Sequence, residues 1–310
     1  MTKVNVFLIG AAKAGTTALS ELLAHHEDIA PMAIKEPSHF CKDVHEINFT
    51  PSYERMLDWN EGTYFSKSKL SKRHIGFVSS PNNYTLLLKE ALSSGPASHV
   101  LDASTAYLYS ETAAKEVFRY NPAARIIVTL RNPVTRAYSH YNMARKYGKE
   151  KRTFFKAIQD ESILDRAIWG IDECYLELGD YHQQLQRWTA LFPKEQILVL
   201  FHDDLLSEPQ NTMDRVCEFL DISAKTLTEV SEANTAEVPR SRLVSALLLG
   251  SLSSFIATVL PPILKKRVKP LILKKPESMD DASRTFLVHY FASANQALEK
   301  ALNSSLKHWK

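Results

Sequence analysis

A glycine-rich segment near the start of the chain has the residue types of a phosphate-binding loop. It spans residues 10–17 and directly follows the apolar stretch 4–9, which predicts a strand. Its two glycines have the spacing at which such loops present backbone N–H groups to a phosphate. In a nucleoside-triphosphate loop the lysine follows the second glycine, but here Thr16 stands there and Lys13 lies inside the loop. Lys13 therefore suits a bridging oxygen that becomes negative as a bond beyond one 5′-phosphate breaks.

A second motif combines a basic side chain and a hydroxyl. Arg131 follows the apolar stretch 125–130, a predicted strand, and Ser139 lies within the helix predicted for 134–146. Pro133 suits the first turn of that helix. A guanidinium and a hydroxyl can bind a second phosphate. Alone, the pair is typical of an ordinary surface, so its interpretation depends on the loop with Lys13.

Strands and helices alternate along most of the chain. The loop leads into a predicted helix at 16–26. Further predicted strands are 99–103, 125–130 and 196–201, each followed by a predicted helix at 111–119, 134–146 and 209–220. This order predicts an α/β fold with a central parallel, doubly wound sheet flanked by helices and with ligands at the carboxyl ends of the strands.

We expect one domain over 1–310, because neither a repeat nor a Pro/Gly/Ser-rich linker is present. Residues 53–96 are predicted to be a loop-rich and helical insertion over the sheet. Residues 240–275 are predicted to be an apolar and basic helical cover. Within it, 243–264 carries no charge and is followed by a basic cluster ending at Lys269. The serines and prolines of this stretch favour buried or site-covering helices, with peripheral contact of 243–269 with anionic lipid, or a membrane span, as the alternatives.

Composition narrows the classes of partner. The chain has 310 residues, 45% hydrophobic and 24% charged, enough to bury one large core. A formal net charge of +3 is too small to indicate a nucleic-acid partner and is compatible with a small anionic ligand. Three widely spaced cysteines favour reduced thiols in the cytoplasm, and the 11 histidines have no metal-ligand spacing. We expect no metal and no cleaved targeting segment.

Taken together, the motifs resemble those of sulfotransferases that use 3′-phosphoadenosine 5′-phosphosulfate (PAPS), which have a P-loop-like fold. The loop 10–17 is similar to their 5′-phosphosulfate loop, and 131–139 is similar to their 3′-phosphate motif. Residues 35–40, Lys-Glu-Pro-Ser-His-Phe, resemble a segment of glycan (heparan-sulfate-type) sulfotransferases in which the glutamate is the base. Residues 101–108, 179–206 and 290–309 resemble other parts of bacterial members.

The resemblance implies roles for individual residues. Lys13 would stabilise the oxygen that leaves sulfur, while Arg131 and Ser139 would bind the 3′-phosphate. The late basic loop of the family has its nearest counterpart at Arg240 and Arg242, which lack the usual neighbouring glycine. The loop residues that would bind PAPS are Ala12, Lys13, Ala14, Gly15, Thr16 and Thr17.

Two side chains are candidates for the base that takes the acceptor's proton. Glu36 matches the glycan-sulfotransferase position and is preferred. His39 has an ordinary pKa better suited to neutral pH, but a polar residue that supports the loop explains it equally well.

The resemblance implies transfer of a sulfuryl group to a hydroxyl, less often an amine, of a carbohydrate, lipid or secondary metabolite. One alternative is a P-loop small-molecule kinase, which would need a lysine after Gly15 and ligands for Mg²⁺. The other is a non-catalytic nucleotide-binding or membrane-associated protein, which would have no need of Lys13 and Glu36.

Overall fold

The structure is a computed structural model that describes residues 3–45, 47–93, 95–227, 238–239, 273–274 and 276–309. Arg240, Arg242 and the apolar stretch 243–264 lie outside the described residues. Two compact units are present. The first comprises Met1–Arg131, Asp180–Ser231 and Ala294–Ser305, and the second comprises Asn132–Gly179, Glu232–Ser293 and Leu306–Lys310. The single domain expected over 1–310 stays a prediction.

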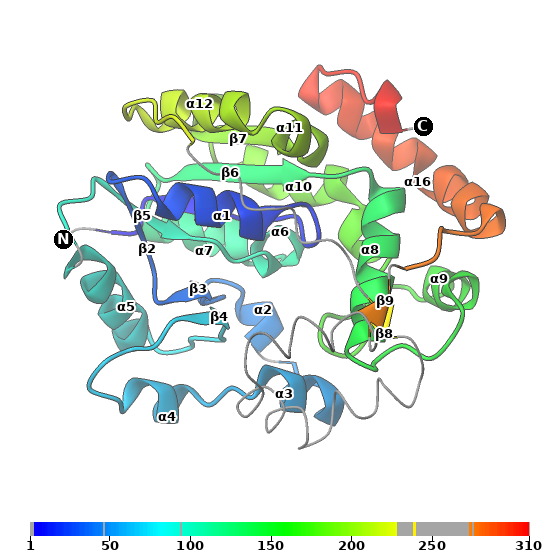
Figure 1. Ribbon diagram of the computed structural model, residues 1–310, viewed down its shortest axis with the longest axis horizontal. Helices are drawn as coiled ribbons and strands as arrows, with labels where there is room; N and C mark the ends of the chain where they lie inside the picture. The colour runs from blue at the N-terminus through cyan, green and yellow to red at the C-terminus, as the bar shows by residue number, and fades with distance from the viewer. Residues whose placement is uncertain are drawn as a thin grey trace. The chain divides into compact units, whose positions relative to one another are not determined.

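The first unit is built on a five-stranded parallel sheet (Figure 1). Its strands, in spatial order, are β2 (Ile29–Pro31), β5 (His99–Asp102), β1 (Val6–Leu8), β6 (Arg125–Leu130) and β7 (Ile197–Phe201). The register pairs Val6 with Leu101 on one side and with Arg125 on the other. Because all strands are parallel, their carboxyl ends meet at one edge, where the ligands of such sheets bind.

Helices cover both faces of this sheet. They are α1 (Thr16–Ala24), α5 (Pro81–Ser93), α6 (Ala106–Tyr109), α7 (Ala113–Tyr120), α10 (Tyr181–Thr189), α11 (His202–Ser207) and α12 (Pro209–Leu220). On one face, Val6 and Leu8 of β1 pack in a cluster with α1 and α12. Phe7 points the other way and contacts the rings of Phe40 and Tyr107. The alternation along β1 thus fills two cores, and the predicted doubly wound α/β fold is confirmed.

Residues 34–75, which include part of the predicted insertion 53–96, form a small second sheet and several helices. Strand β3 (Ile34–Glu36) pairs in parallel with β4 (Arg73–Ile75). The intervening helices are α2 (Lys42–His45), α3 (Pro51–Leu57) and α4 (Glu61–Phe65). The following helix α5 packs against β2 and β5, so it is one of the helices that cover the main sheet. The β3–β4 pairing places β4 directly beside Glu36.

The second unit is helical, with its own apolar core. It contains α8 (Pro133–Lys146), α9 (Phe154–Ser162), the turns η1 (Glu177–Gly179) and η3 (Lys307–Trp309), the pair β8 (Val238–Pro239) and β9 (Leu273–Lys274), and the first part of α16 (Asp281–Leu302). The remaining turn, η2 (Lys194–Gln196), precedes β7 in the first unit. Gly179 allows close packing here, because a Cβ would lie 2.7 Å from Phe291 Cζ.

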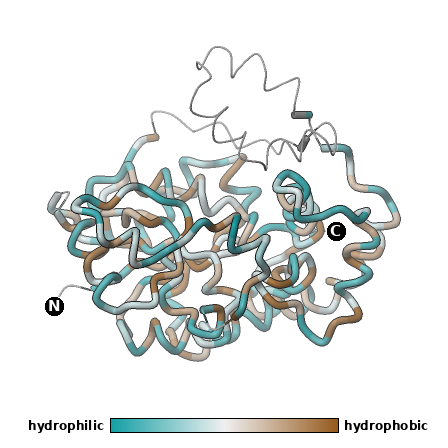
Figure 2. Tube along the Cα trace, turned by 90° about the horizontal axis from the view of Figure 1, so that it is seen from below, coloured by the Kyte–Doolittle hydropathy of each residue, from teal (hydrophilic) through white to brown (hydrophobic). Residues whose placement is uncertain are grey.

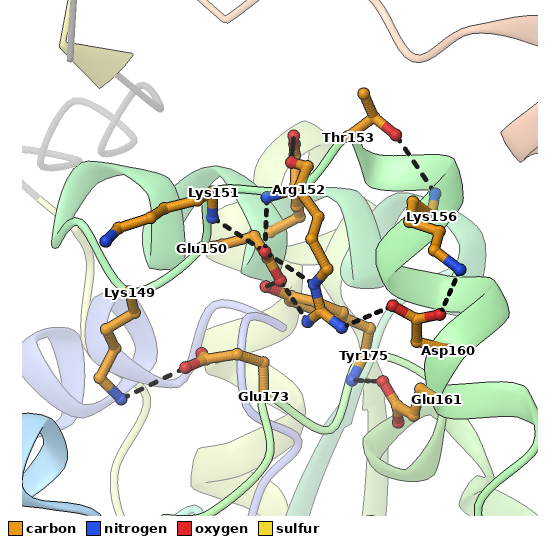
Figure 3. A network of polar contacts seen from close by, with 11 residues as sticks. Lys149, Glu150, Lys151, Arg152, Thr153, Lys156, Asp160, Glu161, Glu173 and Tyr175 are labelled. Atoms are coloured by element: carbon orange, nitrogen blue, oxygen red, sulfur yellow. Dashed lines mark hydrogen bonds and ion pairs between the residues drawn. The ribbon is translucent and has the colours of Figure 1, made fainter.

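A network of ion pairs joins the segment after α8 to α9 (Figure 3). Arg152 donates to Glu150 Oε2 at 2.7 Å and to Asp160 Oδ2 at 3.0 Å, and Tyr175 donates its hydroxyl to Glu150 at 3.2 Å. On the other side of Tyr175, the Glu161 carboxylate accepts backbone N–H bonds from residues 175–177. These contacts fix the path of the chain across the second unit.

Apolar and polar stretches alternate along the trace of the described residues (Figure 2). In that part of the chain, none of the helices is both long and apolar enough to cross a bilayer. The whole of 243–269, for which a lipid contact was expected, lies outside the described residues.

Candidate active site

The glycine-rich loop is fixed to the end of β6 by backbone hydrogen bonds. Ala11 N donates to Thr129 O at 2.7 Å, and Gly10 O accepts from Thr129 N at 2.8 Å and from the Thr129 hydroxyl at 3.1 Å. Position 10 requires glycine because the loop passes close to Leu108: a Cβ at this position would lie 2.9 Å from Leu108 Cβ. Lys13 adopts a φ of 69°, at the turn of the loop. The loop that carries Lys13 is thus anchored to β6 by backbone hydrogen bonds.

The loop ends at the N-terminus of α1. Gly15 is the N-cap residue, with a φ of 86°, a conformation that favours glycine. A Cβ there would lie 3.0 Å from Leu205 Cδ2 and 3.1 Å from His202 Cδ2. Thr16 is buried and Thr17 half-buried in the first turn. The first N–H groups of a helix have no partner within the helix, and its N-terminus attracts anions, so this end can bind a phosphate.

Arg131 meets the loop from the carboxyl end of β6. Its guanidinium donates to Lys13 O at 3.2 Å, and its own carbonyl accepts a hydrogen bond from the Tyr181 hydroxyl at 2.9 Å. Burial lowers the pKa of Arg131, while the charge of Asp203 opposes that effect. An arginine side chain in a protein keeps its proton even when its pKa is lowered. The half-buried Arg131 guanidinium is therefore a positive charge beside Lys13. The first unit therefore brings two predicted site residues together.

His202 completes this group and was not among the predicted site residues. It is the first residue of α11, directly after β7, and its ring lies against Gly15. Burial and the nearby Arg131 charge lower the pKa of His202. Its place at the end of a parallel strand was the signal that could have identified it from sequence.

Glu36 lies at the end of β3 with both carboxylate oxygens engaged. Oε1 accepts from Lys35 Nζ at 2.8 Å, and Oε2 accepts from the Thr105 hydroxyl at 2.7 Å and from Thr105 N at 3.2 Å. Burial alone would raise the pKa of Glu36, but the Lys35 ammonium and the hydrogen bonds from Lys35 and Thr105 outweigh it, and the pKa lies below its ordinary value. At neutral pH Glu36 is a fixed negative charge.

A buried carboxylic acid supports the segment that holds Glu36. Asp102, at the end of β5, accepts hydrogen bonds from the hydroxyls of Tyr84 (2.9 Å), Tyr107 (2.8 Å) and Ser104 (2.6 Å). Burial raises the pKa of Asp102 to about 6, although these hydrogen bonds oppose the shift. The Ser104 hydroxyl oxygen in turn accepts from Ser38 N at 2.9 Å. Asp102 thereby links the end of β5 to the residues just after β3.

His39 has the environment of a structural residue. Its Nδ1 donates to Val78 O at 2.6 Å, and its ring stacks on Tyr84 with centroids 4.3 Å apart. Burial lowers the pKa of His39. The sequence left two roles open for His39, the catalytic base or a support for the loop. These contacts favour the support.

The remaining predicted residues belong to the second unit or are not among the described residues. Ser139 is half-buried on α8 in the second unit, whereas Arg131 belongs to the first. Arg240 and Arg242 lie outside the described residues. In the described parts of the chain, no group of three or more His, Cys, Asp or Glu side chains could hold a metal ion.

The fold and the loop define the class of protein. A parallel α/β sheet carries a glycine loop, a helix N-terminus, a lysine inside the loop and an arginine on the neighbouring strand end. This is a P-loop-like phosphate-binding architecture.

Comparison with known proteins identifies the family. Residues 3–247 match the family model described as the sulfotransferase domain. The chain is 26% identical over 304 residues to a human bifunctional heparan sulfate N-deacetylase/N-sulfotransferase 3, covering 96% of this chain and 29% of the relative. It is 28% identical over 301 residues to the Drosophila melanogaster bifunctional heparan sulfate N-deacetylase/N-sulfotransferase, covering 95% of this chain and 25% of the relative. The chain belongs to the sulfotransferase domain family, and the resemblance noted from its motifs is confirmed.

A solved structure supports the fold. A sulfotransferase from Alicyclobacillus acidocaldarius superimposes with a TM-score of 0.72 at 22% identity, covering 100% of this chain and 99% of that one. The P-loop-like sulfotransferase fold expected from the motifs is therefore confirmed. By contrast, the chain spans less than a third of the length of the heparan sulfate relatives.

Proposed function

We propose that this protein transfers a sulfuryl group from PAPS to a hydroxyl or amine of a carbohydrate. The observation that carries the proposal is the position of Lys13 inside the loop, with its backbone carbonyl hydrogen-bonded to Arg131. Loops that bind a nucleoside triphosphate have a lysine directly after the second glycine, whereas this chain has Thr16 at that position. A kinase is therefore disfavoured.

Each of these residues has a separate role in the proposed reaction. The loop residues Ala12–Thr17 and the N-terminus of α1 bind the 5′-phosphate. The sequence motif assigns the 3′-phosphate to Arg131 and Ser139. Arg240 and Arg242, which lie outside the described residues, are the candidates for a further contact with the nucleotide. Lys13 meets the bridging oxygen, where negative charge develops as the sulfur–oxygen bond breaks. No metal is needed, because Lys13 supplies the positive field.

Glu36 is the carboxylate that drives loss of the acceptor's proton. It is preferred to His39, because the Nδ1 atom of His39 is bonded to Val78 O and its ring is stacked on Tyr84. A nearby negative charge favours departure of a proton from a hydroxyl or amine as the new bond to sulfur forms.

A carbohydrate acceptor is proposed because relatives aligned over almost the whole chain are named for heparan sulfate. Their names also include N-sulfotransferase, which makes an amine a stronger candidate than sequence motifs alone suggest.

The test is a transfer assay with purified protein, PAPS and a panel of acceptors that contains de-N-sulfated heparan sulfate, neutral oligosaccharides, sterols and phenols. We expect a mass gain of one sulfuryl group on a carbohydrate, without added metal. Transfer to the phenol or sterol alone would contradict the carbohydrate assignment. No transfer to any acceptor would contradict the activity.

A further inference from the structure

A second histidine stands beside Glu36 on the solvent side. His74, in the middle of β4, has its Nε2 atom 3.5 Å from Glu36 Oε1, and its side chain is 55% exposed. The register pairs Ile34 with Arg73 and Glu36 with Ile75, which places His74 opposite Lys35. The backbone bond from Gly76 N to Glu36 O, at 2.9 Å, fixes β4 at this position. The pairing of the two strands thus places His74 beside Lys35, the residue that precedes Glu36.

The surroundings of Glu36 make it a poor acceptor for a proton. Its side chain is only 8% exposed, and each of its oxygens already accepts a hydrogen bond from Lys35 or Thr105. A proton arriving at this carboxylate would have to compete with those donors. A carboxylate held in this way serves better as a permanent counterion for a neighbouring cation.

We propose that His74 is a further catalytic residue, which takes the proton of the acceptor while Glu36 stabilises the imidazolium that forms. The proposal rests on the proposed sulfuryl transfer and refines the role of Glu36 within it. His74 Nε2 lies 3.5 Å from Glu36 Oε1, and in this proposal Nδ1 is the nitrogen that receives the proton. In the Ser-His-Asp triad a carboxylate likewise stabilises the imidazolium that forms beside it.

The acceptor's O–H or N–H bond breaks and its proton passes to His74 Nδ1 as the acceptor forms its bond to sulfur. The bond between sulfur and the 5′-phosphate oxygen breaks, and its electron pair stays on that oxygen beside Lys13. His74 then releases the proton to water, which its exposure allows.

The charges around His74 are compatible with this role. Burial lowers the pKa of His74, the Glu36 and Glu21 carboxylates oppose that effect, and the Lys35 and Lys13 ammonium groups add to it. The pKa consequently lies below its ordinary value of 6.5, so the ring is neutral and able to accept a proton at pH 7.

The pairing of the two side chains can be tested without an acceptor. Titration of His74 by NMR in the wild type and in Glu36→Gln should show a lower pKa in the variant, because an opposite charge has been removed. An unchanged pKa would contradict the interaction with Glu36.

The catalytic role is tested by His74→Gln, with His289→Gln as the matched control. We expect turnover of PAPS with the best acceptor of the panel to fall by about 10² or more in His74→Gln, with unchanged affinity for 3′-phosphoadenosine 5′-phosphate (PAP). The acidic limb of the pH profile, below pH 6.5 in the wild type, should disappear. Added imidazole should restore part of the activity of His74→Ala. In Glu36→Gln the limb should persist at lower pH.

The outcomes separate this proposal from the proposed function. Wild-type transfer with normal turnover in His74→Gln would overturn the role of His74 alone. If the acidic limb of the pH profile survives in His74→Gln but vanishes in Glu36→Gln, then Glu36 and not His74 is the base. A wild-type protein without any transfer would overturn the proposed function and this refinement with it.

Discussion

Lys13 is the residue that most clearly separates this site from a triphosphate site. Lys13→Ala should lower turnover by about 10² to 10³, the loss measured when one preorganised donor to a developing oxyanion is removed. PAP affinity should fall far less, because the lost stabilisation develops only in the transition state. Lys89→Ala, on the exposed face of α5, is the control and should leave kcat unchanged. Near-normal kcat in Lys13→Ala would refute the role given to the lysine.

Arg131 distinguishes PAP from other adenylates in this account. Arg131→Ala should weaken PAP by about 1.5–3 kcal/mol, the value of a hydrogen bond to a charged group. Adenosine 5′-phosphate, which lacks the 3′-phosphate, should be affected much less. Calorimetry with both ligands measures the difference. An equal loss for both would assign Arg131 to fixing the loop through its bond to Lys13 O.

At the scale of elements, the end of β5 supports the segment around Glu36 through Asp102. The pKa of Asp102 is raised to about 6 by burial, above its ordinary value of 3.8. The folded protein thus binds this proton more tightly than the unfolded chain. The resulting stability is fully present below the unfolded pKa and is lost as the pH rises through the folded pKa.

Asp102→Asn removes that titration. The free energy of unfolding of the wild type, minus that of Asp102→Asn, should fall by up to roughly 3 kcal/mol between about pH 4 and pH 7. Urea unfolding at a series of pH values gives this difference. A constant or rising difference would show that the Asp102 carboxyl is not protonated more readily in the folded state.

Elements with strong local patterns were predictable from sequence. The stretch 125–130 forms β6 and 209–220 forms α12 at the expected bounds, because their apolar residues follow one clear period. Strands β2, β3 and β4 have three residues each, too few to show a period. They form because the larger fold pairs them. The β3–β4 pair in particular could not be anticipated from the loop-rich composition of 53–96.

The site residues also divide into those that local sequence predicts and those that depend on the fold. Lys13 and Arg131 could be proposed from the sequence because their motifs consist of residues adjacent in sequence. His74, Thr105 and His202 reach the site through contacts between distant segments, as in the bond from Thr105 to Glu36 across 69 positions. Such neighbours depend on strand order, which sequence periodicity does not encode.

For the whole molecule, the central claim is that the site binds the nucleotide product of PAPS in preference to a triphosphate. Anything that binds the folded state raises its melting temperature, so a thermal shift measures this preference directly. With PAP in excess and no metal, we expect a strong increase in Tm, and ATP with Mg²⁺ should produce little change. A large shift with ATP and Mg²⁺ and none with PAP would contradict the account.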